Sequence, residues 1–298
     1  MPARATSFSF QQLARERFEA LQARLRKEAA ADADVVVHDV RRELKKLRAL
    51  LRLIRPHWGE DAFRLENACL RDAGRLLAPL RDAWVHLALT QSLAQERKGE
   101  AVSRVLEFAA GRFREAYDGV VREKPPERCF SEVAGLLAAA AKRVPEWPDP
   151  VADPFASCSE GYRKSYQRSR ARLSRTLSHP SVRNLHELRK GCKDLRYQLE
   201  LLAVPGRRPF GSLISSLHKL TDLLGKNHDL AVLREALERM MAEALTQRHL
   251  LVLHESLEAQ QRATLDGAIA VGCRLFAAKP KRFIERLEQA WAKSASQP

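Results

Sequence analysis

The sequence predicts an all-α fold built from two similar halves, and three observations lead to this prediction. Apolar residues recur three and four positions apart along almost the whole chain, which is the period of a helix packed on one face. Prolines gather in short stretches that interrupt this period, so these stretches mark helix ends. The second half also repeats patterns of the first, as a duplicated domain does. We find no convincing strand pattern.

The apolar period and the proline stretches together give the expected helices. In the first half they span about 8–30, 35–55, 62–77, 80–97, 100–122 and 128–143. In the second half they span about 157–177, 181–203, 210–225, 228–246, 248–277 and 281–293. The proline-rich sequence VPEWPDPVADPF separates the halves. We therefore expect one bundle over 1–143, a linker over 144–156 and a second bundle over 157–298.

The repeat is clearest around two histidine-bearing segments. HDVRRELKKLRALLRLI at 38–54 aligns with HELRKGCKDLRYQLELL at 186–202, an offset of 148 positions. The same offset aligns ARERFEALQARL, from position 14, with YRKSYQRSRARL, from position 162. An offset of 147 aligns LRDAGRLLAPLRDAWV, from position 70, with LHKLTDLLGKNHDLAV, from position 217. Two tandem helical bundles follow from duplication.

Composition limits the classes of partner. The chain has 298 residues, enough for about two domains of ordinary size. Lysine and arginine number 52 against 37 acidic residues, which leaves a formal charge of +15. Such a charge repels itself and favours polyanionic partners such as nucleic acid, polyphosphate or an acidic membrane surface. Charge alone does not choose among them.

Cysteine usage and hydropathy predict a cytoplasmic protein. The five cysteines are scattered and never form a CxxC pair, so they indicate neither a disulfide framework nor a zinc site. The N-terminal stretch lacks the apolar core of a signal peptide, and no apolar run approaches the roughly 18 residues of a membrane span. We therefore expect a soluble protein in a reducing compartment.

The basic residues of the helix expected over 35–55 share one face. At about 100° per residue, one sector about 120° wide holds His38, Arg41, Arg42, Lys45 and Arg48. The opposite side holds Leu44, Leu47, Leu50, Leu51 and Ile54, so we expect it to face the core.

The second copy repeats these angles. Its basic sector holds His186, Arg189, Lys190, Lys193 and Arg196, and Tyr197 joins them. The reverse side carries Leu188, Leu195, Leu199 and Leu202. No acidic residue of either helix falls centrally within the basic sector, so we expect these cations not to be neutralised within their own helix. The alternative is a solvated face that serves only solubility.

This arrangement of cations suits phosphate groups. Cations one helical turn apart are spaced by about 5.4 Å, close to the spacing of charges along a phosphate chain. Arginine offers bidentate donors and lysine a mobile point charge. His38 and His186 each add a hydrogen bond, and a nearby phosphate would favour their protonated form. The alternative for these histidines is a packed side chain bonded to a carboxylate.

These segments resemble the CHAD domain, the conserved histidine α-helical domain, over nearly the whole chain. The likeness rests on the two histidine motifs with their cations and on the later LAPLRDAWV and LGKNHDLAV. The resemblance implies two bundles of about four main helices each, related by a pseudo-twofold axis, with a basic central groove or pore. It also implies inorganic polyphosphate as the ligand, whereas the residues alone indicate a duplicated helical polyanion binder.

The two copies differ at one pair of positions, and this puts that sub-site in doubt. His228 and Asp229 of the second copy stand where the first has Arg81 and Asp82, with Pro79 just before. We expect Arg81 and His228 to contact polyphosphate. Asp82 and Asp229 follow an expected helix break, so we expect them to cap helices or orient arginines. Holding Mg²⁺ on a phosphate is their alternative use.

Other cations are weaker candidates for the same ligand. Arg15 and Arg163 occupy matching positions in the two copies. Lys279 and Arg282 lie at an expected helix start, where free backbone donors add to their charge. For these cations a solvated surface position is the competing interpretation.

Catalysis and metal binding find little support in the sequence. A phosphotransferase using His38 or His186 as phosphoryl acceptor is the enzymatic alternative, but there is no Walker loop, paired-carboxylate signature or HExxH motif. The strand-rich triphosphate-hydrolysing domain found in some CHAD proteins is absent from this sequence. The histidines also lack the spacing of zinc ligands. We therefore expect no catalytic activity, no cofactor and no metal.

Nucleic acid is the main rival ligand. Arginine-rich helices and the net charge suit it, but no repeated stacking platform or recognition helix is evident. We therefore expect binding of polyphosphate, with targeting to polyphosphate granules as one role. The sequence leaves the oligomeric state open, a homo-oligomer included.

Overall fold

The structure is a computed structural model that describes residues 8–27, 32–96, 100–149, 153–202, 209–241 and 247–295. Within these ranges the chain forms helices and no strand, so the predicted all-α class is confirmed. The α-helices are α1 (Phe10–Lys27), α2 (Ala33–Ile54), α3 (Glu60–Leu76), α4 (Ala78–Glu96), α5 (Glu100–Glu123), α6 (Pro126–Arg143), α7 (Pro154–Ser178), α8 (Val182–Leu201), α9 (Gly211–Met241), α10 (Gln247–Leu275) and α11 (Pro280–Ala295). Two short 3₁₀ turns are η1 (Arg55–His57) and η2 (Val144–Glu146).

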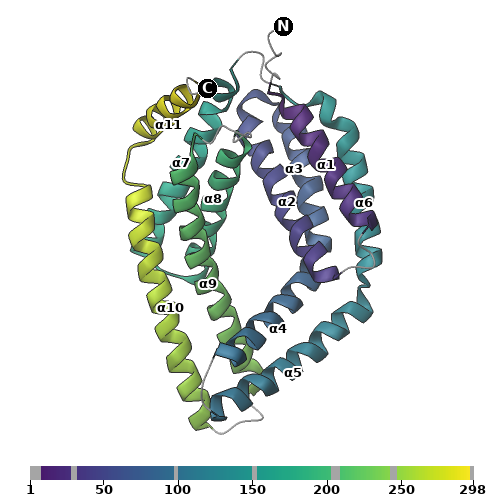
Figure 1. The fold of residues 1–298 in the computed structure, drawn as a ribbon, viewed down its shortest axis with the longest axis vertical. Helices are drawn as coiled ribbons and strands as arrows, with labels where there is room; N and C mark the ends of the chain where they lie inside the picture. Colours follow the sequence, from purple (N-terminus) through teal and green to yellow (C-terminus); the bar gives the residue numbers. More distant parts are fainter. Residues whose placement is uncertain are drawn as a thin grey trace.

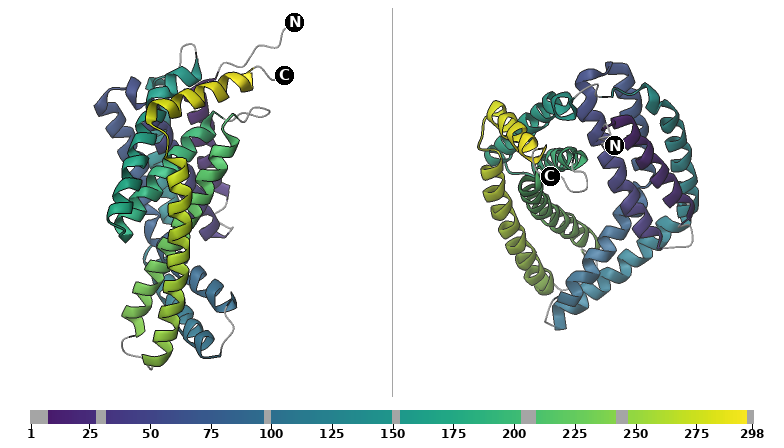
Figure 2. Two further views of the ribbon diagram at one scale, coloured as in Figure 1. Left: turned by 90° about the vertical axis from the view of Figure 1, so that its left-hand side faces the viewer. Right: turned by 45° about the horizontal axis from the view of Figure 1, so that its top comes forward.

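The helices are arranged as a ring. α1, α2, α3 and α6 form one side, and α7, α8 and α10 with the first part of α9 form the other (Figure 1). α4 and α5 run toward the end of the molecule at which α9 gives way to α10 (Figure 1). The tilted view in Figure 2 shows the same circular path of the chain. Consequently α2 and α4 border the middle of the molecule opposite α8 and α9.

Two hydrophobic cores hold the ring together, and each combines residues from both halves of the chain. The larger core extends from Phe10 of α1 to Leu287 of α11. The smaller core joins α4, α5, α9 and α10 through Leu87, Phe113, Leu233 and Leu257, among others. Because burying apolar surface is the main favourable term in folding, contact between the halves contributes to the stability of both cores.

The two halves also meet through close backbone contacts between α2 and the pair α7 and α8. A side chain at Gly161 of α7 would overlap the backbone of Leu53, so only glycine permits this approach. Gln198 of α8 donates from Nε2 to the carbonyl oxygen of Ala49 at 3.1 Å. This contact holds the histidine-bearing helices α2 and α8 against each other where the two halves of the chain meet.

The predicted break between helices 210–225 and 228–246 is wrong, because α9 continues through it. Glycine and asparagine in GKNH favour a break by propensity, but tertiary contacts stabilise the helix here. Asn227 is buried and donates to the carbonyl oxygen of Gln261 in α10 at 2.8 Å. A hydrogen bond to a neighbouring helix thus overrides local preference.

The predicted linker 144–156 contains the turn η2 and the buried Trp147, and α7 already begins at Pro154. Its residues 150–152 lie outside the described residues, as do the predicted helix ends at 28–30, 97, 203 and 242–246. In the part of the chain that the structure describes, no helix is both long and apolar enough to cross a membrane.

Candidate functional site

The predicted core faces of the two histidine-bearing helices are confirmed. Leu44, Leu47, Leu50, Leu51 and Ile54 of α2 are all buried. Leu188, Leu195 and Leu199 of α8 are also buried, as is Leu202 just after the helix. Packing of these leucines fixes the rotation of each helix and therefore directs the opposite sector away from the core.

Five cations from three helices form what we call the central cluster. Its members are Arg41 and Lys45 of α2, Arg81 of α4, and Arg189 and Lys193 of α8. Within the described residues none of the five makes an ion pair. Arg41 donates from Nη1 to the carbonyl oxygen of Gly74 at 2.5 Å, so its charge is hydrogen-bonded but not neutralised.

The loss of water lowers the pKa of both lysines in the central cluster. Lys45 reaches solvent, but protein around it removes much of its hydration, and Arg41, Arg189 and Arg81 repel it. Together these effects lower its pKa to about 8. Burial, followed by repulsion from Arg189 and Lys45, lowers the pKa of Lys193 to about 7. Each lysine thus interacts with a cation of the other half of the chain, Lys45 with Arg189 and Lys193 with Lys45.

Three carboxylates partly compensate the charge of the central cluster from a distance. Asp82 of α4 favours the charged forms of Arg41 and Lys45, and Asp229 of α9 favours those of Arg81 and Lys193. Asp34 of α2 also favours the charged form of Arg81. None of the three carboxylates makes an ion pair with another described residue. The expected capping role is wrong for both Asp82 and Asp229, because Asp82 lies inside α4 and Asp229 lies inside the continuous α9. Their expected role in orienting arginines stays a prediction.

Three histidines lie beside the central cluster. The ring centroids of His186 and His228 are 5.0 Å apart, because α8 packs against α9 at this point. Burial lowers the pKa of both, and it also lowers that of His38, which lies near Arg81. The Nδ1 atoms of His186 and His228 are buried without a hydrogen-bond partner in the described structure. A bound anion that approached these rings would favour their protonated forms.

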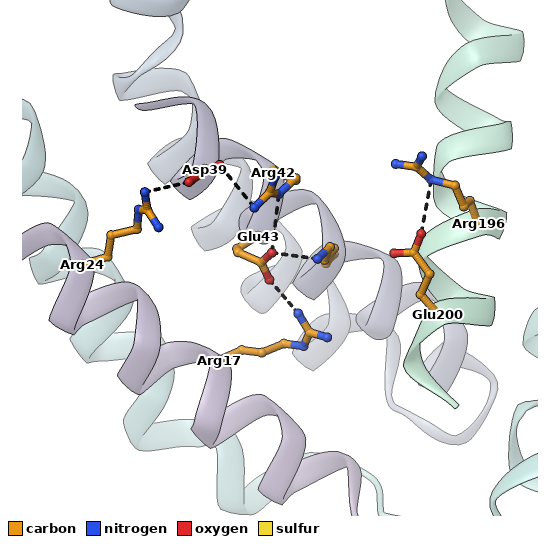
Figure 3. A network of polar contacts seen from close by, with 8 residues as sticks. Arg17, Arg24, Asp39, Arg42, Glu43, Arg196 and Glu200 are labelled. Atoms are coloured by element: carbon orange, nitrogen blue, oxygen red, sulfur yellow. Dashed lines mark hydrogen bonds and ion pairs between the residues drawn. The ribbon is translucent and has the colours of Figure 1, made fainter. Parts of the chain in front are cut away.

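Arg42 and Lys190 were expected to be free, and this expectation is wrong. Arg42 lies 3.2 Å from Asp39, which also pairs with Arg24 of α1 at 2.7 Å. Figure 3 shows this network, in which Glu43 also joins Arg42 to Arg17. At the matching positions of the second half, Glu187 pairs with Arg172 at 3.1 Å and with Lys190 at 2.7 Å. We call these two groups the flanking networks.

The sequence argument failed here because it considered only the centre of the basic sector. Asp39 and Glu187 lie one turn before Arg42 and Lys190, between the basic sector and the leucine side, and long side chains span this separation readily. A cation from the preceding helix then completes each group. The acid between two cations is itself a repeated feature of the two halves.

Arg48 lies outside the central cluster, in a second cationic region. Its Nε donates to Asn67 Oδ1 of α3 at 3.0 Å. Burial, followed by repulsion from Arg52, lowers its pKa to about 10. Arg168 of α7 is also repelled by Arg52, which itself pairs with Asp194 at 2.6 Å. The sequence analysis did not foresee this region because it forms only where α2, α3, α7 and α8 meet.

Arg196 and Tyr197 are buried, which contradicts their predicted place on an outward sector. Arg196 is 9% exposed, and its guanidinium lies over the Tyr197 ring at 4.9 Å. Its Nε also lies 3.4 Å from Glu200, as drawn in Figure 3. Packing of α8 against α9 and against α2 covers a wider part of this helix than its leucine stripe indicates.

The weaker candidates lie apart from the central cluster. Arg15 is exposed on α1 and donates to Gln11 at 3.3 Å. Arg163 is exposed on α7 and forms a bidentate pair with Glu160, with both contacts at 2.7 Å. Lys279 and Arg282 are exposed at the predicted helix start, but α11 packs on α7. Their part in ligand binding stays a prediction.

Two supporting residues were missed by the sequence analysis. Trp84 lies beneath Arg81, with the guanidinium 4.7 Å from the ring centroid, and this contact holds the arginine in place. The spacing of Arg81 and Trp84 by three helical positions was the available signal. Gly225 of α9 lets Arg189 approach, because a Cβ there would lie 3.1 Å from its Nη2. The sequence contains no pattern that predicts the approach of Arg189 to Gly225.

The fold and the site define an all-α protein in which matching helices from two halves of the chain bring unpaired cations together. The model of the CHAD domain matches residues 12–238, which is more than half of the chain. The chain therefore belongs to the CHAD domain family. Among solved structures, it is similar to the crystal structure of the CHAD domain from the plant Ricinus communis, with 17% identity and a TM-score of 0.49. That match covers 93% of this chain and 89% of the plant chain. None of the curated proteins matches it.

Proposed function

We propose that the chain binds inorganic polyphosphate at the central cluster and acts as a binding module without catalysis. The observation that carries the proposal is the absence of ion pairs from all five cations of that cluster within the described structure. Like charges held together in partly desolvated surroundings raise the free energy of the unbound protein. A phosphate chain among them removes this repulsion and supplies the missing acceptors.

The geometry also favours a linear ligand over a single phosphate. Cations of α2, α4 and α8 contribute from both sides of the ring's middle, so neighbouring phosphates have separate partners. Charge-assisted hydrogen bonds contribute about 1.5–3 kcal/mol each, and several together give useful affinity. Affinity should therefore rise with chain length until all partners are engaged. Targeting of the protein to polyphosphate granules is the role we propose for this binding.

The family resemblance supports the choice of ligand, and the residues around the central cluster are consistent with it. Tyr197 is buried under Arg196 and is therefore not available as a stacking platform for bases. Stacking on aromatic side chains supplies much of the binding of single-stranded nucleic acid. Trp84 is only partly buried, but Arg81 already covers one face of its ring. A ligand with phosphates and without bases therefore suits this site better.

A competition titration at near-physiological salt tests the proposal. Long-chain polyphosphate would compete against single-stranded and duplex nucleic acid of equal phosphate count for the full chain. We expect polyphosphate to bind at least tenfold more tightly, since charge-assisted contacts suit closely spaced bare phosphates. Equal or tighter binding of nucleic acid would overturn the proposal and make the chain a nucleic-acid-binding protein.

A further inference from the structure

We propose that Lys45 and Lys193 are sites of covalent acylation by acyl phosphates, which are anionic donors that join a carboxyl group to a phosphate. The inference rests on the proposed function in one respect, because both use the central cluster to hold a phosphate group. It requires no polyphosphate, so the two can be tested separately.

The amines of Lys45 and Lys193 have no partner among the described residues. No described residue forms a hydrogen bond or an ion pair with Nζ of Lys45 or Lys193. On the same helices, Lys46 lies 2.8 Å from Glu43 and Lys190 lies 2.7 Å from Glu187. The chain thus holds two unpaired and two paired lysines in the same helical setting.

Both amines are open to solvent and lie among guanidinium groups. Lys45 is exposed and Lys193 is partly exposed, so a small donor can reach both amines. The charged groups around them are the guanidiniums of Arg41, Arg81, Arg189 and Arg196 and the more distant carboxylates Asp82 and Asp229, and Lys45 also acts on Lys193. Guanidinium groups bind phosphate oxygens in a bidentate manner. They would hold the donor's phosphate close to either lysine.

The surroundings of the two amines also favour their nucleophilic form. Only an unprotonated amine attacks an acyl carbon, and desolvation together with neighbouring cations is a known way to produce one. Both influences act here and lower the pKa of Lys45 to about 8 and that of Lys193 to about 7. A substantial fraction of both amines is therefore neutral near physiological pH.

The reaction balances without any further reactant. The lone pair of Nζ forms a bond to the acyl carbon, and the bond from that carbon to the phosphate oxygen breaks. Inorganic phosphate leaves with the electron pair, and the proton from nitrogen passes to water or to the released phosphate. The product is an uncharged amide, so each modification removes one cation from the central cluster.

The test exposes the full chain to acetyl phosphate at pH 7.5 and follows acetylation of each lysine by peptide mass spectrometry. We expect Lys45 and Lys193 to react about tenfold faster than exposed lysines elsewhere on the chain, because neutral amines are the reactive form. Lys142 of α6 and Lys281 of α11 are the exposed controls, and Lys46 and Lys190 are the paired controls. Equal rates at all six lysines would overturn the inference.

A second reagent separates phosphate capture from simple amine reactivity. The uncharged N-hydroxysuccinimide ester of acetate should prefer Lys45 and Lys193 less strongly than acetyl phosphate does. Replacement of the neighbouring cation by Arg189→Gln, with folding checked by circular dichroism, should reduce the preference for acetyl phosphate. If both reagents showed the same preference, capture by the guanidinium groups would be ruled out.

The outcome is distinguishable from that of the proposed function. Saturating polyphosphate should protect Lys45 and Lys193 but leave Lys142 unaffected, and acetylated protein should bind polyphosphate more weakly. Normal polyphosphate binding without preferential acetylation overturns this inference alone. Preferential acetylation in a protein that does not bind polyphosphate overturns the proposed function alone.

Discussion

The central cluster and the flanking networks contain similar cations on the same two helices, yet their electrostatic states are opposite. Arg41 and Arg42 are neighbours in the sequence, as are Arg189 and Lys190. In each pair the first residue belongs to the central cluster without an ion pair, and the second belongs to a flanking network with an acidic partner. The difference arises from one helical step of about 100°.

This comparison teaches that membership of the histidine motif does not define the site. Asp39 and Glu187 sit where they neutralise the outer cation of each motif and leave the inner one unpaired. Neutralisation at the edge limits the net repulsion between the halves, while the middle keeps its charge. Because Asp39 and Glu187 occupy matching positions in the two halves, the flanking networks belong to the internal repeat.

Charge reversal in the central cluster should have the largest effect. Arg189→Glu combined with Lys193→Glu removes two contacts and adds repulsion of the ligand, so polyphosphate affinity should fall at least about a hundredfold. Isothermal titration calorimetry at fixed salt would measure it. The matched control is Arg42→Glu with Lys190→Glu, which makes the same change of charge in the flanking networks. An equal loss in both double variants would mean that net charge, rather than the central cluster, determines binding.

The pH dependence of polyphosphate binding should also distinguish the central cluster from the flanking networks. Free Lys193 has a pKa of about 7 and free Lys45 one of about 8, and bound phosphate would raise both. Binding then takes up protons, so affinity is complete below the free pKa values and declines as pH rises through them. We expect about a tenfold loss of affinity between pH 7 and pH 9, measured at constant ionic strength.

Lys193→Arg provides the control for this pH dependence. Arginine keeps its charge over the whole range, so the variant should show a shallower decline. Lys190→Arg should decline as the unmodified protein does, because Lys190 is already paired with Glu187. A profile that Lys193→Arg leaves unchanged would assign the proton uptake to other groups, such as the pair His186 and His228.

Sequence reasoning succeeded where a single helix determines the answer. The leucine faces of α2 and α8 followed from the helical period, and the structure buries every one of those leucines. The all-α class followed from the same period along the chain. These features depend on residues within a few turns of one another, so the sequence displays them directly.

Reasoning failed where two helices meet. The continuity of α9 depends on Asn227 and its contact with α10, and the burial of Tyr197 depends on the packing of α8. Arg48 and Lys45 share one predicted sector but contact different neighbours, because α3 and α7 approach only one end of that sector. Such outcomes depend on distances between helices, which a helical wheel does not contain.

Gly225→Ala should have a smaller effect, lowering polyphosphate affinity without lowering the stability of the fold. The added Cβ would lie 3.1 Å from Arg189 Nη2, so the guanidinium must shift. Polyphosphate affinity should fall about threefold, a modest share of one charge-assisted contact. The melting temperature should not fall, because alanine is favoured over glycine inside a helix by about 1 kcal/mol. Gly267→Ala in α10 is the control, since a Cβ there meets Leu223 at 3.4 Å instead.

The smallest effect should come from removing a single paired cation. Lys190→Gln leaves the central cluster intact and frees Glu187 to interact with Arg172 alone. Exposed ion pairs contribute only about 0–1 kcal/mol, so neither stability nor polyphosphate affinity should change more than about twofold in its equilibrium constant. Lys193→Gln, three positions away on α8, should reduce affinity several times more under the same conditions. Equal effects of the two substitutions would contradict the distinction between paired and unpaired cations, because both remove the same charge from the same helix.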